Sequence, residues 1–285
     1  MLTTSHYSPV ASEALVVGEA HLPRLGFGTY GMSGPRLEEI LVAALRHGFR
    51  HIDTAQIYQN EADVGAAIRT SGVSRHDIFV TTKVWVDSYP ADRFSASVDQ
   101  SLRDLKSDYI DLLLVHWPRG SVSIAEQIEG LNQAVDAGKV RHIGVSNFNV
   151  DMMQSAIKFS RHPIVTNQVE YHPFLDQSLL LKAAHVNQTS LMAYCGMAVG
   201  RVFESPVLKE IAARNKRTIA QIVLRWLIQQ PDVVALTRTE KFERIVDNVR
   251  VFDFELSQED MQTITMLRSP GSRVVNPAHL APAWD

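Results

Sequence analysis

Short apolar runs rich in β-branched residues alternate with stretches of helical periodicity along most of the chain. The runs are bounded by polar or turn-forming residues, a pattern typical of parallel strands that are covered on both faces. Strands are predicted at 25–29, 51–54, 78–83, 110–116, 140–146, 164–169, 190–194 and 232–237. Helices are predicted between and after them, at 37–47, 61–69, 94–105, 124–137, 150–159, 179–186, 207–214, 219–229 and 242–249. The chain therefore contains eight predicted strand–helix repeats.

Eight repeats favour an α/β fold of the closed (β/α)8 TIM-barrel type over an open doubly wound sheet, which stays the alternative. Segment 15–23 is predicted to form an N-terminal hairpin that closes the bottom of the barrel. Segment 257–267 is predicted to form an extra C-terminal helix, capped by Ser257. We expect a flexible tail at 1–14 and a single barrel domain over 15–285, irregular from about residue 270.

The composition points to a small-molecule partner. The chain has 285 residues, 45% of them hydrophobic, which is enough for a large core. Its net charge of -3 provides no positive field for nucleic acid, and no Lys/Arg run suggests a membrane surface. The lone Cys195 excludes an internal disulfide, and neither a signal peptide nor a membrane-spanning run is predicted. We therefore expect a monomeric cytoplasmic protein without nucleic-acid or membrane partners.

Polar residues stand at the ends of seven predicted strands. In a (β/α)8 barrel the carboxyl ends of the strands converge on one face, where active sites lie. The residues concerned are Asp53, Lys83, His116, Ser146, Asn147, Gln168, Tyr194, Thr237 and Arg238. Each alone has an ordinary structural explanation, such as a helix cap or a buried core histidine. Their arrangement at one mouth indicates a functional site.

Four residues predict a site that protonates a carbonyl oxygen. Tyr58 lies in the loop after strand 51–54, and a phenol of ordinary pKa about 10 is a useful acid near neutral pH only if the phenolate is stabilised. An ammonium about 4 Å away, here Lys83, would contribute about 4 kcal/mol at an effective dielectric of about 20 and lower that pKa. Asp53 would keep Lys83 charged, and His116 would donate a hydrogen bond to the carbonyl oxygen. Hydride would have to reach the carbon from another group.

The sequence resembles the aldo-keto reductase family over roughly residues 15–269. The resemblance rests, in order, on GFGTY (26–30), HIDTAQIYQNE (51–61), TTKVW (81–85), DYIDLLLVHWP (108–118), IGVSNF (143–148), NQVEYHP (167–173), AQIVLRWL (220–227) and RIVDNVRVFDFELS (244–257). The chain is similar in style to bacterial members such as the 2,5-diketo-gluconate reductases. The resemblance implies an oxidoreductase that reduces aldehydes and ketones, reversibly, by hydride transfer from NAD(P)H. The implied catalytic tetrad, with Tyr58 as general acid, is Asp53, Tyr58, Lys83 and His116.

The resemblance also implies a nicotinamide cofactor lying across the mouth without a Rossmann fold, and Gly26 and Gly28 form no dinucleotide fingerprint. The implied cofactor-binding residues are Gly28, Thr29, Asp53, Ser146, Asn147, Gln168, Tyr194, Cys195, Met197, Arg238, Thr239, Arg244 and Asn248. Among them, Ser146, Asn147 and Gln168 would bind the carboxamide, and Tyr194 would stack on the nicotinamide ring. Residues 195–197 depart from the family's usual Ser-Pro-Leu, and residues 237–239 depart from its usual Pro-Lys-Ser.

NADPH is the expected cofactor, with NADH possible. The cations Arg238 and Arg244 could converge on the ribose phosphate, and Arg offers it a planar fork of donors. Glu240 and Asp247 oppose this preference, because a carboxylate near the ribose repels phosphate.

An aromatic substrate site for aldehydes and small ketones is expected at the mouth. Its predicted residues are Tyr30, Trp85, His116 and Trp117, with Trp284 of the C-terminal tail as a further candidate. Two other functions stay open at this point. One is a non-catalytic nucleotide-sensing regulatory subunit on the same fold, and the other a metal-dependent hydrolase that uses His51, Asp53 and His116. No metal is expected, because Lys83 would compete for Asp53 and a second histidine pair is missing.

Overall fold

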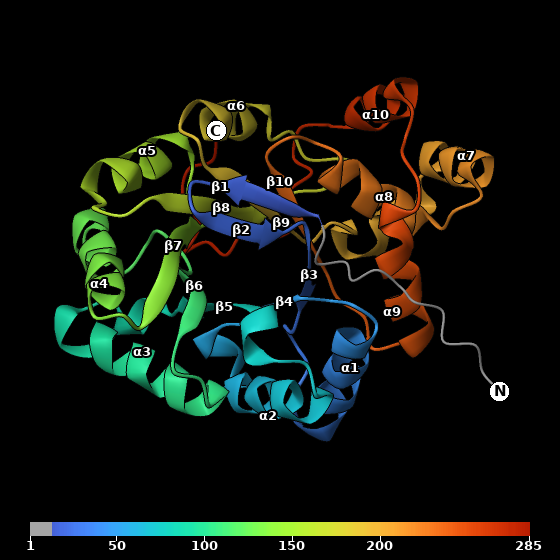
Figure 1. The fold of residues 1–285 in the computed structure, drawn as a ribbon. Coiled ribbons are helices and arrows are strands. Elements are labelled where there is room, and N and C mark those ends of the chain that lie inside the picture. The colour runs from blue at the N-terminus through green and yellow to red at the C-terminus, as the bar shows by residue number, and fades with distance from the viewer. Residues whose placement is uncertain (1–12) are drawn as a thin grey trace.

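The computed structural model describes residues 13–285 and contains a closed barrel of eight parallel strands (Figure 1). The strands follow one another around the barrel in the order β10-β3-β4-β5-β6-β7-β8-β9. Their bounds are β3 (Leu25–Gly28), β4 (His51–Asp53), β5 (Phe79–Val84), β6 (Ile110–Val115), β7 (Val140–Ser146), β8 (Ile164–Glu170), β9 (Ser190–Tyr194) and β10 (Val233–Thr237). The predicted (β/α)8 barrel is confirmed, and each strand lies within a residue or two of its predicted place.

Helices cover the outside of the barrel. They are α1 (Gly34–Arg46), α2 (Glu61–Ser71), α3 (Ala91–Leu105), α4 (Ile124–Asp136), α5 (Val150–Phe159), α6 (Ser178–Val186), α7 (Pro206–Asn215), α8 (Ile219–Ile228), α9 (Phe242–Val249) and α10 (Gln258–Thr265). Reciprocal capping boxes begin two of them, with Ser123 before α4 and Thr218 before α8. Short 3-10 segments sit in the loops after the strands, including η2 (Gln56–Tyr58), η4 (Val86–Ser88) and η5 (Ala198–Glu204). The pattern of apolar and polar residues in the sequence did not predict these 3-10 segments.

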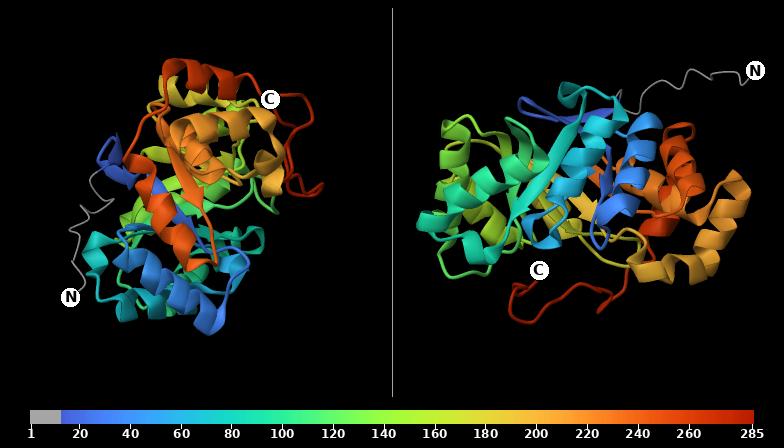
Figure 2. Two further views of the ribbon diagram at one scale, coloured as in Figure 1. Left: turned by 90° about the vertical axis from the view of Figure 1, so that its right-hand side faces the viewer. Right: turned by 90° about the horizontal axis from the view of Figure 1, so that it is seen from below.

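Opposite ends of the barrel are covered by different segments (Figure 2). The predicted hairpin, β1 (Ala14–Val17) and β2 (Ala20–Pro23), lies across one end. The C-terminal segment, which we define as residues 270–285, runs across the other end. Of the expected tail at 1–14, residues 1–12 lie outside the described part of the chain, whereas Ala14 already belongs to β1.

Apolar side chains fill the hairpin end of the barrel. Leu15 and Leu22 of the hairpin pack there with Leu112, Val165 and Leu236 from the strands. Gly26 belongs to the same packing, because a Cβ at this position would lie 2.6 Å from Leu236 and 2.7 Å from His51. Strand packing thus explains the glycine. A polar site can therefore form only at the end where the strands terminate.

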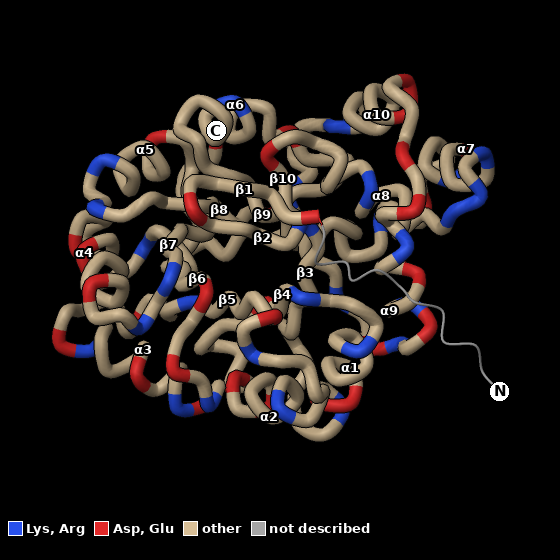
Figure 3. Tube along the Cα trace, in the orientation of Figure 1, with Lys and Arg blue, Asp and Glu red and all other residues tan. Residues whose placement is uncertain are grey.

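Charged residues of both signs are interspersed over the outer helices and loops (Figure 3). No helix of the described residues is long and apolar enough to cross a membrane.

Candidate active site

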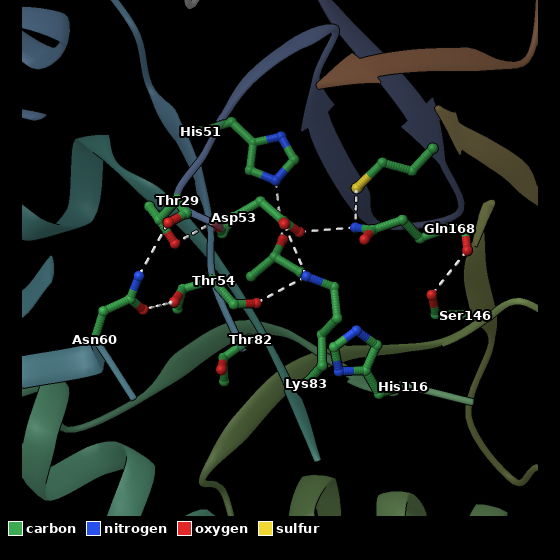
Figure 4. A network of polar contacts seen from close by, with 12 residues as sticks. Thr29, His51, Asp53, Thr54, Asn60, Thr82, Lys83, His116, Ser146 and Gln168 are labelled. Carbon is green, nitrogen blue, oxygen red and sulfur yellow. Dashed lines mark hydrogen bonds and ion pairs between the residues drawn. The ribbon is translucent and has the colours of Figure 1, made fainter. Parts of the chain in front are cut away.

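A buried ion pair joins the ends of β4 and β5 (Figure 4). Lys83 Nζ donates to Asp53 Oδ1 at 2.7 Å and to the carbonyl oxygen of Thr54 at 2.8 Å. The second carboxylate oxygen of Asp53 accepts a hydrogen bond from Gln168 Nε2 at 2.7 Å. Burial lowers the pKa of Lys83, while the charge and hydrogen bond of Asp53 act in the opposite direction. The predicted pairing of Asp53 with Lys83 is confirmed, and Gln168 fixes the carboxylate from across the barrel.

Tyr58 ends the η2 turn directly after β4, in a loop that a buried asparagine holds in place. Asn60 Nδ2 donates to the carbonyl oxygens of Thr29 (3.0 Å) and Met32 (2.9 Å), and Asn60 Oδ1 accepts from Thr54 Oγ1 (2.6 Å). Because the loop is anchored on both sides, the Tyr58 ring lies over the ion pair, with Lys83 Nζ 5.1 Å from the ring centroid. The polar residues after the strand therefore position the phenol.

The pKa of Tyr58 differs from the expectation. We expected Lys83 to lower it, but burial raises the pKa of Tyr58 well above its ordinary value, and Asp53 and Tyr30 raise it further. The expected direction is wrong for this structure, because loss of solvent disfavours the phenolate and the nearby Asp53 charge disfavours it further. The phenol is therefore fully protonated at neutral pH.

His116 follows β6 and faces the same group of side chains. Its ring lies 5.7 Å from the ring of Tyr58 and 5.3 Å from that of Trp85, in edge-on contacts. Burial, followed by the nearby Lys83 charge, lowers the pKa of His116 well below its ordinary value, so the imidazole is neutral. Within residues 13–285, Nδ1 of this ring is buried without a hydrogen-bond partner.

A second polar group occupies the ends of β7, β8 and β9. Ser146 Oγ donates to the carbonyl oxygen of Gln168 at 2.8 Å and accepts from Asn147 Nδ2 at 3.1 Å. Tyr194 OH donates to Asn147 Oδ1 at 2.6 Å. This group meets the ion pair of Asp53 and Lys83 at Gln168, so the two groups are continuous. A hydroxyl, two amides and an aromatic ring together offer the donors, acceptors and stacking face that suit a primary carboxamide on a flat ring.

The neighbouring implied cofactor residues are placed by backbone contacts. The amide of Thr29, next to Gly28 at the end of β3, donates to the carbonyl oxygen of Asp53 at 3.0 Å. Cys195 follows β9 with a positive φ of 58°, and its carbonyl oxygen accepts from the amide of Ala198. Met197 packs against the main core.

The residues implied for the adenosine end lie just after β10 and in α9, and of these the two arginines are exposed. Arg238 Nη2 pairs with Glu240 Oε1 at 2.6 Å, both side chains about half exposed. Arg244 is exposed on α9 and forms no ion pair with the described part of the chain, including Asp247. Thr239 and Asn248 are buried, and Asn248 Nδ2 donates to Thr237 Oγ1 at 3.0 Å.

The predicted substrate residues divide into two groups. Tyr30 is 69% exposed and packs edge-on against Tyr58, and Trp85 contacts His116, so both lie beside the candidate catalytic side chains. Trp117 is only 6% exposed, and its backbone exchanges hydrogen bonds with Tyr89 OH. A packing role thus explains Trp117 better than substrate contact does. Trp284 lies in the C-terminal segment, under the guanidinium of Arg273.

The metal-hydrolase alternative finds no support in the geometry. His51 Nε2 is hydrogen-bonded to Thr81 Oγ1 at 2.9 Å, and Asp53 is held by Lys83 and Gln168. Among the residues that the structure describes, no cluster of three or more His, Cys, Asp or Glu side chains is arranged to hold a metal.

Glu170, the last residue of β8, was not predicted as part of the site. It is fully buried and accepts hydrogen bonds from His172 and from the C-terminal segment. Glu170 is part of the motif NQVEYHP. Its partners in the C-terminal segment lie more than a hundred positions further along the chain, so no local sequence pattern indicates these contacts.

Comparison with known proteins agrees with this geometry. The pattern of the aldo/keto reductase family matches residues 15–269. The methylglyoxal reductase DkgB of Escherichia coli O157:H7 is 36% identical over 267 residues, covering 93% of this chain and 99% of that protein. The glyoxal reductase of Bacillus subtilis (strain 168) is 37% identical over 260 residues, covering 91% and 94%. A crystal structure under the provisional name 2,5-diketo-D-gluconic acid reductase B is 52% identical with a TM-score of 0.94, covering 95% and 97%.

A (β/α)8 barrel with an Asp, Tyr, Lys and His cluster at its mouth defines a class of carbonyl-reducing oxidoreductases, and the chain belongs to the aldo/keto reductase family.

Proposed function

We propose that this chain is a reductase of small aldehydes and α-dicarbonyl compounds that prefers NADPH and uses Tyr58 as its general acid. The observation that carries the proposal is the buried pair of Lys83 and Asp53, 2.7 Å apart, directly beneath the ring of Tyr58. A buried ion pair is costly to form, so its place beside a protonated phenol supports a catalytic role for it.

Tyr58 holds the proton that the reaction consumes. When bound, the reduced nicotinamide supplies a hydride to the carbonyl carbon. Negative charge then develops on the carbonyl oxygen, and the phenol transfers its proton to that oxygen. The phenolate left behind faces Lys83, whose ammonium is held in place by Asp53 and the carbonyl oxygen of Thr54. Because these partners are already aligned, the charge is stabilised without reorganisation of the site.

His116 orients the carbonyl group. Nδ1 of the neutral ring is buried without a hydrogen-bond partner among residues 13–285, and an unprotonated nitrogen there costs less than a buried N–H without an acceptor. The proton therefore sits on Nε2, which can donate to the carbonyl oxygen. Trp85 and Tyr30 provide an apolar surround that excludes water from this hydrogen bond.

The residues of the second polar group fit the nicotinamide. Ser146, Asn147 and Gln168 would hold its carboxamide, and the ring of Tyr194, from the next strand, would support its face. Arg244, exposed and not engaged in an ion pair within residues 13–285, would receive the ribose phosphate of NADPH. We also propose one domain over the barrel and the C-terminal segment, a monomeric state, and a reducing cytoplasmic compartment, which the single cysteine supports.

The test is turnover by the purified chain. The relatives suggest methylglyoxal, glyoxal and 2,5-diketo-D-gluconate as carbonyl substrates, each assayed with NADPH and with NADH. We expect carbonyl-dependent oxidation of both cofactors, with the higher kcat/KM for NADPH. Binding of NADPH without turnover of any carbonyl compound would instead favour the regulatory-subunit alternative.

A further inference from the structure

A buried carboxylate lies behind the strand that carries Lys83. Glu61 is the first residue of α2 and is buried between the barrel and its outer helices. Its Oε1 accepts a hydrogen bond from Thr82 Oγ1 of β5 at 2.5 Å, and its Oε2 accepts one from Ser101 Oγ of α3 at 3.1 Å. Because successive side chains of a strand point to opposite faces, Thr82 faces the helices and Lys83 faces the barrel interior. Glu61 thus holds the outer side of the strand whose inner side carries the ion pair.

The hydrogen bonds continue from Ser101 to the loop of Tyr58. Ser101 Oγ accepts from Gln56 Nε2 at 3.2 Å, and Gln56 Oε1 accepts from the backbone amide of Trp85 at 3.0 Å. Gln56 and Tyr58 belong to the same turn, η2, and Trp85 lies two positions after Lys83. A closed ring therefore ties stretch 56–61, which carries the phenol, to stretch 82–85, which carries the ammonium. Its members are Gln56, Ser101, Glu61, Thr82 and Trp85.

Glu61 has the hydrogen bonds of an ionised carboxyl group. Both of its oxygens accept from hydroxyl groups, as those of a carboxylate do. Burial raises the pKa of Glu61, and the charge of Asp104 also raises it, whereas the two hydroxyls and the charge of Lys83 lower it. A buried charge is costly unless another group compensates it, and Lys83 is the cation that does so here.

Lys83 in turn has a second source of negative charge in Glu61. Burial lowers the pKa of Lys83, whereas the charge and hydrogen bond of Asp53 raise it, followed by the charge of Glu61. The other titratable groups that face Lys83 are His51, Tyr58 and His116. Burial lowers the pKa of both histidines and raises that of Tyr58. As the pH rises above neutrality, Lys83 is therefore the group of this set that loses its proton first.

We propose that Glu61 is a positioning residue for carbonyl reduction: it clamps the loop of Tyr58 to the strand end of Lys83, and its charge acts with that of Asp53 to keep Lys83 an ammonium. This inference rests on the proposed function. The clamp keeps the phenol over the ammonium, and the charge keeps that ammonium available to the phenolate at alkaline pH. Removing the charge narrows the pH range of activity, and opening the ring lowers kcat. Neither change affects cofactor binding.

The charge is tested by the pH dependence of kcat for methylglyoxal with saturating NADPH. Glu61→Gln keeps the size of the side chain and an oxygen that accepts from Thr82, but it carries no charge. We expect the alkaline limb of kcat to move to lower pH by about half a unit or more. Asp104→Asn is the matched control, because it removes a carboxylate near Glu61 on α3, and it should leave the limb in place.

The clamp is tested by two serine substitutions one turn apart on α3. Ser101→Ala opens the ring and leaves the charge of Glu61 in place. Ser97 Oγ donates to the carbonyl oxygen of Phe94 within the helix at 2.8 Å, so Ser97→Ala is the matched control. We expect kcat to fall about fivefold in Ser101→Ala and hardly at all in Ser97→Ala. The alkaline limb and the dissociation constant of NADPH should be unchanged in both variants.

Three results would overturn the proposal: an alkaline limb that stays in place in Glu61→Gln, equal shifts in Glu61→Gln and Asp104→Asn, or equal kcat values for the two serine variants. If Glu61→Gln does not fold, the serine pair still decides. Failure of the wild type to reduce methylglyoxal, glyoxal and 2,5-diketo-D-gluconate would instead show that the proposed function is wrong.

Discussion

The ends of β4 to β6 form a buried half of the barrel mouth held by an ion pair, whereas the two arginines at the end of β10 and on α9 lie in an exposed half. In the first, Lys83 and Asp53 lie together with almost no solvent contact. In the second, Arg238 pairs with Glu240 in solvent, and Arg244 extends from α9. The first half is therefore held by buried hydrogen bonds, whereas the proposed cofactor-distinguishing half presents charges that solvent screens. Substitutions in the two halves should differ in size and in the step affected.

Lys83→Met should have the largest effect. The substitution removes the cation that faces the phenolate and leaves Asp53 as a buried carboxylate without its main partner. General acid catalysis is worth about 10² to 10⁴-fold, so kcat should fall at least about a hundredfold. The measurement is the single-turnover rate with saturating NADPH. Retention of NADPH binding, followed by fluorescence quenching, is the control for folding.

Protonation of a buried histidine should destabilise the fold at low pH. Burial lowers the pKa of His51 to about 4, whereas the unfolded state titrates near the ordinary value of about 6.5. The unfolded chain therefore binds the proton more tightly, and stability present above pH of about 6.5 is lost as the pH falls toward about 4. His51 alone should contribute a slope of about 1.4 kcal/mol per pH unit in this range.

Urea unfolding between pH 4 and pH 7 measures that slope. His51→Gln should flatten it, and His47→Gln, at an exposed position, should not. Equal slopes in wild type and His51→Gln would contradict the assignment.

Arg244→Ala tests the exposed half. A hydrogen-bonded contact with a charged phosphate is worth about 1.5–3 kcal/mol, so kcat/KM for NADPH should fall about tenfold or more. The efficiency with NADH, which lacks this phosphate, should stay the same and serves as the internal control. A wild type that prefers NADH, or equal losses with both cofactors, would disprove the role of Arg244.

Glu240→Gln should have the smallest effect and the opposite sign. Glu240 pairs with Arg238 at 2.6 Å and competes with a phosphate for it. Exposed pairs are worth about 0.2–1 kcal/mol, so releasing Arg238 should improve kcat/KM for NADPH by about fivefold at most. A decrease on this substitution would show that Glu240 itself contacts the cofactor.

The order of the barrel elements was predictable from sequence because apolar residues recur at one spacing in strands and at another in helices. β7 and α5, for example, lie where the pattern predicted them. That Asp53, Lys83 and His116 lie together was predictable for a related reason, because a parallel barrel brings all strand ends to one face.

Features that depend on distant contacts could not be predicted. The raised pKa of Tyr58 results from the sum of its surroundings, and Trp117 is buried by Tyr89 from another loop. The attachment of Val274 to Glu170 joins residues 104 positions apart. Local periodicity contains no information about any of these contacts.

The most direct test of the account is the rate of carbonyl reduction by Tyr58→Phe. The substitution removes one hydroxyl and keeps the ring that packs against Tyr30 and His116, so folding and NADPH affinity should be nearly unchanged. Under single-turnover conditions with methylglyoxal, we predict a loss of at least about a hundredfold in the hydride-transfer rate. A variant that keeps more than about half of the wild-type rate when chemistry limits turnover would contradict the assignment of Tyr58 as the general acid.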